Sequence, residues 1–285
     1  MKIAAVTMVY NEAHFLPRWV RHYAAQFGPE HCTVIDHGSD DRCTDASSGV
    51  NLVRIPRSPT DEPQRAKFIS TFCASLLNWY DWVVYTDVDE VLVADPAHYP
   101  SIPDLLSVSP HKVVTAVGLN VHHDDPREPP IDPARPVSKQ RRWTMLVAAM
   151  CKPVAISQPV QWAPGFHSSD APVEFGPLFL FHLRNYDTQQ ALLRLHKTRT
   201  MPWREHGADP NAIISDDEYR SRMRQIMGQA RKGGLPFDID RPPLTGLLEM
   251  LKKESEQRKD EVYKLRLSLA LPELWELPQR FVGTF

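Results

Sequence analysis

The sequence predicts an α/β fold: an open, mostly parallel twisted sheet with helices on both faces and a helical C-terminal appendage. Before residue 95 of the 285, four strand-like runs alternate with helical or turn-forming segments, joined by connections of ordinary length. This alternation is typical of parallel sheets. The first run is also continuously apolar and rich in β-branched residues, as in strands that are buried on both faces.

Local signals place the elements of the first half. A helix is predicted over residues 13–26, with aromatic residues on its buried stripe and Gly28 beyond its end. The turn-forming residues 37–41 are suited to capping a short helix. Strands are expected at residues 2–9, 31–36 and 52–55 and from residue 82 toward Asp87, and a long helix at residues 64–78.

The second half is rich in proline, which clusters after residue 94 and predicts long ordered loops. Strands are expected at residues 113–121 and 178–184, and helices at residues 188–199, 216–232 and 244–269. No element is assigned to residues 143–152 and 154–156, which lead into the loop at residues 161–167. We therefore divide the chain into a main domain, residues 1–205, and a helical C-terminal extension, residues 206–285. The last residues of the extension, 275–285, are expected to fold back onto the body.

Composition narrows the class of protein. Hydrophobic residues make up 42% and charged residues 24% of the chain, as in ordinary soluble domains. The net charge of −2 gives no basic field for a nucleic-acid partner. The four cysteines lack C-x-x-C spacing, so we expect reduced thiols and a cytoplasmic location. The first apolar run is too short for a signal peptide and no run is long enough to span a bilayer, which leaves peripheral contact as the expected route to a membrane.

Two carboxylates at the end of the fourth strand are the main functional signal. Asp87 and Asp89 are separated by one valine, so in an extended chain both side chains point the same way. Neighbouring like charges are costly to desolvate unless a cation lies between them. Oxygen ligands of this kind suit Mg²⁺ or Mn²⁺. The simpler interpretation is an exposed strand end whose aspartates cap a turn.

Other polar residues are expected near this pair. Asn11 and Glu12 follow the first strand, and Asp36 ends the second. Because ligands bind outside the carboxyl ends of the strands in open parallel sheets, these side chains should meet at one rim. That convergence predicts a binding site there.

The same three segments resemble a known family. V-T-M-V-Y-N-E at residues 6–12, V-I-D-H-G-S-D-D at 34–41 and Y-T-D-V-D-E at 85–90 are similar in order and spacing to the motifs of GT-A fold glycosyltransferases of the family 2-like group. The resemblance covers about the first 95 residues. His37 stands where an acidic residue is common, and Arg42-Cys43 replaces the usual small residues.

The resemblance implies an inverting, metal-dependent transfer of a sugar from a nucleotide-diphosphate donor to a glycan or lipid-linked acceptor in polysaccharide or glycoconjugate synthesis. Residues 1–205 would then be the catalytic domain. Asp89, with Asp87 nearby, would hold Mn²⁺ or Mg²⁺ against the leaving diphosphate. Asp36 would bind the nucleotide base, and Asn11 or Glu12 would line the base and ribose pocket.

Basic residues and histidines complete the implied site. Cations on the helix at residues 64–78 are candidates for holding nucleotide or phosphate, namely Arg65 and Lys67, although a solvated helix face is the simpler interpretation. The resemblance also implies a metal-binding histidine from a late strand. His182 is the first candidate and His167 the second, against the alternative of hydrogen-bonded core histidines. A later basic run could close over the diphosphate: Arg184, Arg194, His196, Lys197, Arg199 and Arg204.

An inverting transfer needs a carboxylate base near the acceptor hydroxyl. Asp170 and Glu174 follow the aromatic loop at residues 162–167 and are the first candidates, with Asp124 and Asp125 as alternatives. Trp162 and Phe166 in that loop are expected to stack on sugar rings.

Three other functions are alternatives. The residues at 85–92 also resemble the D-x-D-G motif of haloacid-dehalogenase-like, Mg²⁺-dependent phosphatases, but Glu90 replaces the glycine and three βα units precede the motif. A non-catalytic nucleotide-sugar-binding protein is the second alternative. A nucleotidyltransferase is the third, although Tyr10-Asn11-Glu12 is not a glycine-rich loop. The donor base, sugar, acceptor and oligomeric state are not readable from the sequence.

Overall fold

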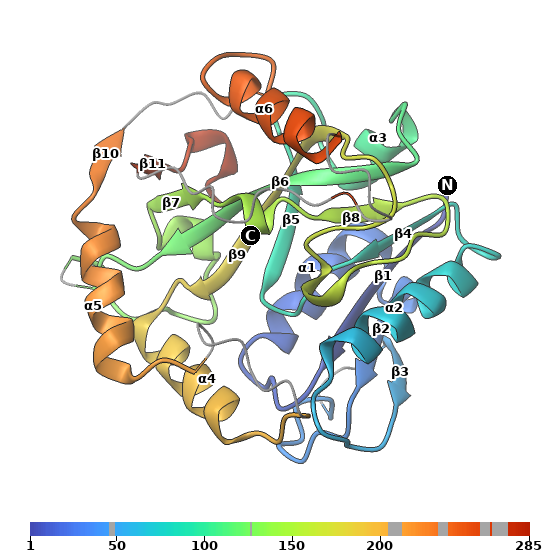
Figure 1. Cartoon of the computed structure of the whole chain (residues 1–285), viewed down its shortest axis with the longest axis horizontal. Helices are drawn as coiled ribbons and strands as arrows, with labels where there is room; N and C mark the ends of the chain where they lie inside the picture. Colours follow the sequence, from blue (N-terminus) through green and yellow to red (C-terminus); the bar gives the residue numbers. More distant parts are fainter. Residues whose placement is uncertain (46–48, 126, 205–212, 233–238, 257–262, 264–272) are drawn as a thin grey trace.

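A computed structural model describes residues 1–45, 49–125, 127–204, 213–232, 239–256, 263 and 273–285. A central sheet divides the molecule, with helices α1 and α2 beside its N-terminal strands and α4, α5 and α6 around the later ones (Figure 1). The strands are β1 (Ile3–Val9), β2 (Cys32–Asp36), β3 (Asn51–Arg54), β4 (Trp82–Tyr85), β5 (Glu90–Ala94), β6 (Val113–His122), β7 (Trp143–Leu146), β8 (Pro153–Ile156), β9 (Phe175–Asn185), β10 (Ala230–Lys232) and β11 (Glu273–Glu276). The helices are α1 (Leu16–Phe27), α2 (Glu62–Leu76), α3 (Ile102–Ser107), α4 (Thr188–Thr200), α5 (Asp216–Met227) and α6 (Leu244–Glu256).

The predicted α/β sheet is confirmed, and its first four strands are parallel. They lie in the order β3-β2-β1-β4, so the chain runs outward from β1 in one direction and then returns to add β4 on the other side. Every residue of β2 and β4 is buried, and β1 is buried except for Met8, which explains the continuous apolar runs. The carboxyl ends of β1 and β4 are therefore neighbours at the point where the strand order reverses.

Helices α1 and α2 follow from local sequence. Helix α1 buries Leu16, Trp19 and Tyr23 at helical spacing, and it ends at Gly28, whose φ is 92°. Helix α2 starts at a capping aspartate, since the Asp61 side chain accepts a hydrogen bond from the Gln64 backbone N–H. The first turn of α2, which follows this cap, contributes Glu62 and Arg65 to the pocket described below.

The later strands add to the sheet mainly in antiparallel pairs. β8 lies between β4 and β6 and is antiparallel to both, and β7 is antiparallel to β6. β9 is parallel to β6 and antiparallel to β5. Strand β5, which follows the aspartate pair directly, was not predicted. Its register places Glu90 opposite His182, so a late strand is brought beside the motif at residues 87–90.

The segment predicted as a helical extension is not purely helical. β11 pairs with β7 in the sheet, and Phe281 packs edge-on against Phe179 with 5.2 Å between ring centroids. The expectation that residues 275–285 fold back onto the body is therefore confirmed. The helix predicted over 244–269 is observed as α6 to Glu256, and all of its later residues except 263 lie outside the described part of the chain. Short α3 was also not predicted.

All four cysteines are buried and free. Across the described ranges, the helices are too short or too polar to cross a bilayer.

Gly118 permits a close approach between β6 and the chain before β8. A Cβ added to Gly118 would lie 2.1 Å from the carbonyl carbon of Met150, and the Gly118 N–H donates to Sγ of Cys151 at 3.3 Å. The segment thus held against the sheet leads directly to Lys152, which enters the pocket described below.

Gly118→Ala is expected to destabilise the protein by about 1–3 kcal/mol, because the new methyl group overlaps a backbone that cannot move freely. Urea unfolding followed by tryptophan fluorescence measures this change. Gly246→Ala in α6 is the matched control, since a Cβ there meets nothing within 4 Å, and an unstrained helical alanine stabilises by up to about 1 kcal/mol. Equal stability of the two variants would contradict this account of Gly118.

Candidate functional site

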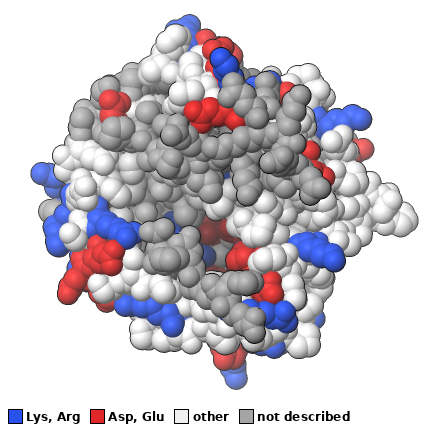
Figure 2. All heavy atoms as spheres, in the orientation of Figure 1, with Lys and Arg blue, Asp and Glu red and all other residues white. Residues whose placement is uncertain are grey.

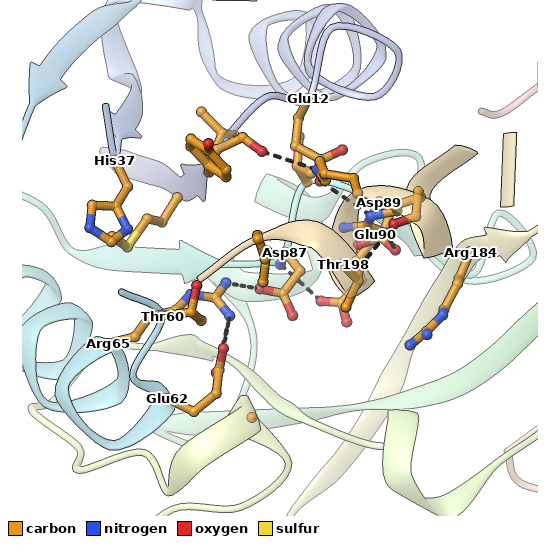
Figure 3. A pocket seen from close by; sticks show the side chains of 18 of the residues that line it. Glu12, His37, Thr60, Glu62, Arg65, Asp87, Asp89, Glu90, Arg184 and Thr198 are labelled. Carbon is orange, nitrogen blue, oxygen red and sulfur yellow. Dashed lines mark hydrogen bonds and ion pairs between the residues drawn. The ribbon is translucent and has the colours of Figure 1, made fainter. Parts of the chain in front are cut away.

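A pocket of about 350 Å³ lies outside the carboxyl ends of β1 and β4. Figure 2 shows a hollow near the centre of one face with charged side chains inside it. Its described lining comes from the ends of β1 and β4, the start of α2, the segment at residues 150–152, β9 and one face of α4. Glu12, Asp87 and Asp89, which are labelled in Figure 3, all line this pocket, as the predicted convergence at one rim requires.

The aspartate pair lies in a turn rather than in an extended strand. The Glu90 N–H donates to the Asp87 carbonyl at 3.0 Å, and Oε2 of Glu90 accepts from the Asp87 N–H at 3.0 Å. The prediction of an extended strand end was wrong because the buried Glu90 side chain closes the turn. Both aspartates nevertheless line the pocket.

Two cations from separate elements hold Asp87. Arg65 of α2 pairs with its Oδ1, and the Lys152 ammonium lies 3.1 Å from its Oδ2. Burial disfavours the carboxylate, but Lys152 and Arg65 outweigh burial and keep the pKa of Asp87 well below its usual range. Asp87 is therefore an anion fixed between two positive charges.

Lys152 is the most enclosed cation of the pocket, with a side chain that is 4% exposed. It contacts Asp87 and also pairs with Oε1 of Glu90. Burial alone would lower the pKa of Lys152, but the two carboxylates raise it above its usual value. The ammonium is thus charged, and its two partners come from the same turn.

Asp89 has its own basic partners. Nε2 of His182 lies 3.1 Å from its Oδ2, and Arg194 of α4 pairs with the same oxygen. Nε of Arg194 donates to Glu12 at 3.2 Å. Burial again opposes ionisation, but Arg194 and His182 hold the pKa of Asp89 well below its usual range. Arg194 therefore ties α4 to the ends of β1 and β4.

Lys197, one turn after Arg194, is fully engaged. Its ammonium donates to the carbonyls of Tyr10 and Asn11, each at 3.0 Å, and pairs with Glu12. Burial lowers the pKa of Lys197. This residue fastens α4 to the loop after β1.

The lining is slightly positive overall. The described lining residues include five carboxylates, and each of them has an Arg or Lys partner. Six Lys and Arg residues line the same pocket, so one positive charge remains when the histidines are neutral. An anion is the complementary ligand.

The expected metal ligands are occupied by other contacts. Nδ1 of His182 lies 2.9 Å from Oδ1 of Asn120, and this contact turns Nε2 toward Asp89, an orientation that suits a metal ligand. In the described residues, however, no three His, Cys, Asp or Glu side chains are grouped to hold a metal ion. Arg65, Lys152 and Arg194 lie against the carboxylates instead. As placed, these side chains do not fit a divalent cation.

His167, the second candidate metal ligand, lines the pocket but its Nδ1 contacts the Ala149 carbonyl. Burial lowers the pKa of His167 to about 4, so it is neutral at physiological pH. Its proposed metal role stays a prediction.

The predicted base-binding residues are used within the loops. The Asn11 amide donates to Asp40 at 2.7 Å, and the residue has a φ of 52°. Asp36 is fully buried, accepts from the Ser39 N–H at 2.8 Å and pairs with Arg54 at 3.1 Å. Neither is among the residues that line the pocket. Both shape the loops that follow β1 and β2.

Only part of the predicted basic set reaches the pocket. Arg65, Arg184, Arg194 and Lys197 line it, whereas Lys67 lies on the exposed face of α2. His196 faces a second hollow on the other side of α4. Arg199 and Arg204 pair with Asp216 and Asp61 away from the lining.

The candidate acceptor bases lie outside the pocket. Asp170 accepts from the Gln161 N–H at 2.8 Å, and Glu174 pairs with Lys252 at 2.7 Å. Asp124 pairs with Arg127 at 3.0 Å, and Asp125 borders the second hollow. The geometry therefore gives no support to these four as bases.

The predicted stacking of sugars on Trp162 and Phe166 was also wrong. The two residues are 5% and 2% exposed, and Phe166 packs against Tyr85 with 4.5 Å between ring centroids. We predicted exposed rings because the loop is rich in aromatic residues, but apolar aromatic rings are more stable in the core than at the surface.

Sequence reasoning missed Lys152 and the cluster formed by Tyr10, His37 and Arg57. The Arg57 guanidinium lies 3.8 Å from the Tyr10 ring centroid, and its Nη1 lies 3.1 Å from Nδ1 of His37. These three residues line the same pocket. Lys152 lies between an apolar run and the buried strand β8, and a single lysine in that position gives no periodic signal that would mark it as a site residue.

The sequence matches no family model and no curated protein. Similar solved structures include a mannose-1-phosphate geranyltransferase from Thermus thermophilus (13% identity, TM-score 0.32, 51% of this chain). Another is a mannosyltransferase from Pyrobaculum calidifontis in complex with GDP-Man and Mn²⁺ (16% identity, TM-score 0.27, 44% of this chain). A third is S. aureus TarS (12% identity, TM-score 0.32, 72% of this chain). The aligned parts cover 49%, 36% and 41% of those chains, so this chain spans less than half of each. TM-scores of this size identify no activity.

Lys152→Met is expected to destabilise the protein by about 3–5 kcal/mol, because it leaves Glu90 buried without its cation. Adding Glu90→Gln should recover part of the loss, since the unpaired buried charge is then removed. Urea unfolding of the two single variants and the double variant gives the coupling energy.

Lys67→Met on the exposed face of α2 controls for the loss of a lysine and should change stability by no more than about 0.5 kcal/mol. A Lys152→Met protein as stable as this control would show that the buried ion pairs do not support the turn.

Proposed function

We propose that this chain is a glycosyltransferase that moves a sugar from a nucleotide-diphosphate donor to a hydroxyl of a glycan or lipid-linked acceptor. The observation that carries the proposal is the position of the pocket at the reversal point of the strand order, between the ends of β1 and β4. Ligands of open α/β sheets bind at such points. The motifs that resemble the GT-A fold supply Glu12, Asp87 and Asp89 to this pocket.

The charge of the lining supports a diphosphate ligand. Six Lys and Arg residues face five carboxylates, and cations at the leaving oxygens stabilise the charge that develops during transfer. We place the nucleoside toward Tyr10, His37 and Arg57, because an aromatic ring and hydrogen-bonding groups lie there. His37 and Arg184 lie on opposite sides of the view in Figure 3, which leaves the space between them for the diphosphate and sugar.

Three finer expectations stay predictions. The residues as placed do not fit Mn²⁺ or Mg²⁺, so no step of the proposed transfer depends on a metal. An inverting course needs a base at the acceptor hydroxyl, and all five lining carboxylates have cationic partners. A role in polysaccharide or glycoconjugate synthesis follows only from the sequence resemblance.

A haloacid-dehalogenase-like phosphatase is a weaker candidate. Its nucleophile would be Asp87, which is held by Arg65 and Lys152, and the place of its flexible glycine is taken by the buried Glu90. A non-catalytic binding protein would have the same pocket without turnover.

The first test is a melting-temperature panel of UDP, GDP and CDP and of their nucleotide sugars. We expect the nucleotides of one base to raise the melting temperature of the protein, because a ligand at a hundred times its Kd stabilises the folded state by about 2.7 kcal/mol. Differential scanning fluorimetry with and without Mn²⁺ measures the shift. Absence of a shift with every nucleotide under both conditions would overturn the proposed function.

Asp89→Asn is expected to lower kcat/KM for donor turnover by about 100-fold or more, because it removes the charge that positions Arg194 and His182. Release of nucleoside diphosphate in the presence of mixed glycan acceptors measures turnover. Glu249→Gln on the exposed part of α6 is the matched control and should retain activity. Hydrolysis of simple phosphomonoesters by the wild-type chain would instead favour the phosphatase.

A further inference from the structure

The carboxylates that the sequence assigns to a metal are already neutralised by the chain's own cations. Arg65 and Lys152 contact the two oxygens of Asp87, and Arg194 contacts Asp89. These partners come from α2, the segment before β8, and α4, three separate parts of the fold. A divalent cation on both aspartates would have to displace them.

Displacement of Lys152 would be especially unfavourable. Its side chain is 4% exposed, and its second partner, Glu90, is 1% exposed. A metal on Asp87 would take from this ammonium one of its two carboxylate partners and would add further positive charge beside it in a low-dielectric environment. Lys152 is therefore a fixed positive charge at the base of the pocket.

Lys152 and Arg194 also keep hydrogen-bond donors for a ligand. An ammonium has three N–H groups, and Asp87 and Glu90 use two of those on Lys152. On Arg194, Nε and Nη1 contact Glu12 and Asp89, and within the described part of the chain Nη2 has no hydrogen-bond partner. Lys197 differs, because three oxygens use all its donors.

We propose that Lys152 and Arg194 bind the diphosphate of the donor directly, and that donor binding requires no divalent cation. This inference rests on the proposed function and names how the site holds its substrate. Both residues line the pocket, and charge-assisted hydrogen bonds from Lys and Arg to phosphate oxygens are strong.

The same contacts would assist transfer. The bond between the anomeric carbon and the β-phosphate oxygen breaks, and its electron pair passes to that oxygen. The acceptor oxygen bonds to the anomeric carbon, and its proton passes to solvent. Lys152 and Arg194 donate hydrogen bonds to the departing diphosphate without losing a proton, so they stabilise its additional negative charge.

The test measures binding of a nucleoside diphosphate by isothermal titration calorimetry. The nucleotide used is the one that raises the melting temperature in the panel described above. Wild-type protein is titrated in EDTA and in Mn²⁺. We expect the two Kd values to agree within about threefold, a difference below 1 kcal/mol. Binding in Mn²⁺ but not in EDTA would overturn the inference while leaving the proposed function intact. Absence of binding in both would overturn the proposed function itself.

A pair of variants tests Lys152 separately. The double variant Lys152→Met with Glu90→Gln, which leaves no unpaired Glu90, is compared with Glu90→Gln alone. We expect the double variant to bind the diphosphate at least about tenfold more weakly in EDTA, as for loss of a hydrogen bond from a charged donor. Affinity for the corresponding uncharged nucleoside should be equal in the two variants, which separates loss of phosphate contact from loss of structure. Equal diphosphate affinity would overturn the role of Lys152, and the wild-type titrations remain decisive if the double variant does not fold.

Discussion

The buried ammonium of Lys152 between Asp87 and Glu90 is the interaction on which the pocket depends. It pairs with two carboxylates of one turn and joins that turn to the chain before β8. Without it, burial would disfavour either the ionised carboxylates or the turn that Glu90 closes. Gly118 supports the same interaction from the opposite side, because the absence of a side chain lets Met150 and Cys151 lie against β6.

The other charged contacts extend this arrangement outward. Arg65 links the capped start of α2 to Asp87, and Arg194 and Lys197 link α4 to Asp89 and Glu12. Elements that are distant in the sequence thus meet through ion pairs at the carboxyl edge of β1 and β4 (Figure 3). A surface with one excess positive charge and spare N–H donors results, and this surface is the basis for proposing a diphosphate ligand.

The N-terminal half of the fold could be predicted because its signals are local. Apolar runs marked β1 and β2, and the glycine after α1 marked its end. The D-x-D pair indicated the site, but its conformation was not predictable, since the turn depends on Lys152, 62 residues from Glu90 in sequence. A single lysine before a proline has no periodicity to detect. Trp162 and Phe166 were misplaced for a related reason: composition shows that a loop is aromatic but not whether its rings are buried.

The pairing of β11 with β7 has a consequence for biosynthesis. Residues 273–281 complete the sheet and cover Phe179 of β9, and Arg280 forms an ion pair with Asp95 across 185 positions. These contacts cannot form until residues 273–281 have been synthesised and have left the ribosome. A nascent polypeptide without these residues therefore leaves the apolar edge near β7 and β9 exposed.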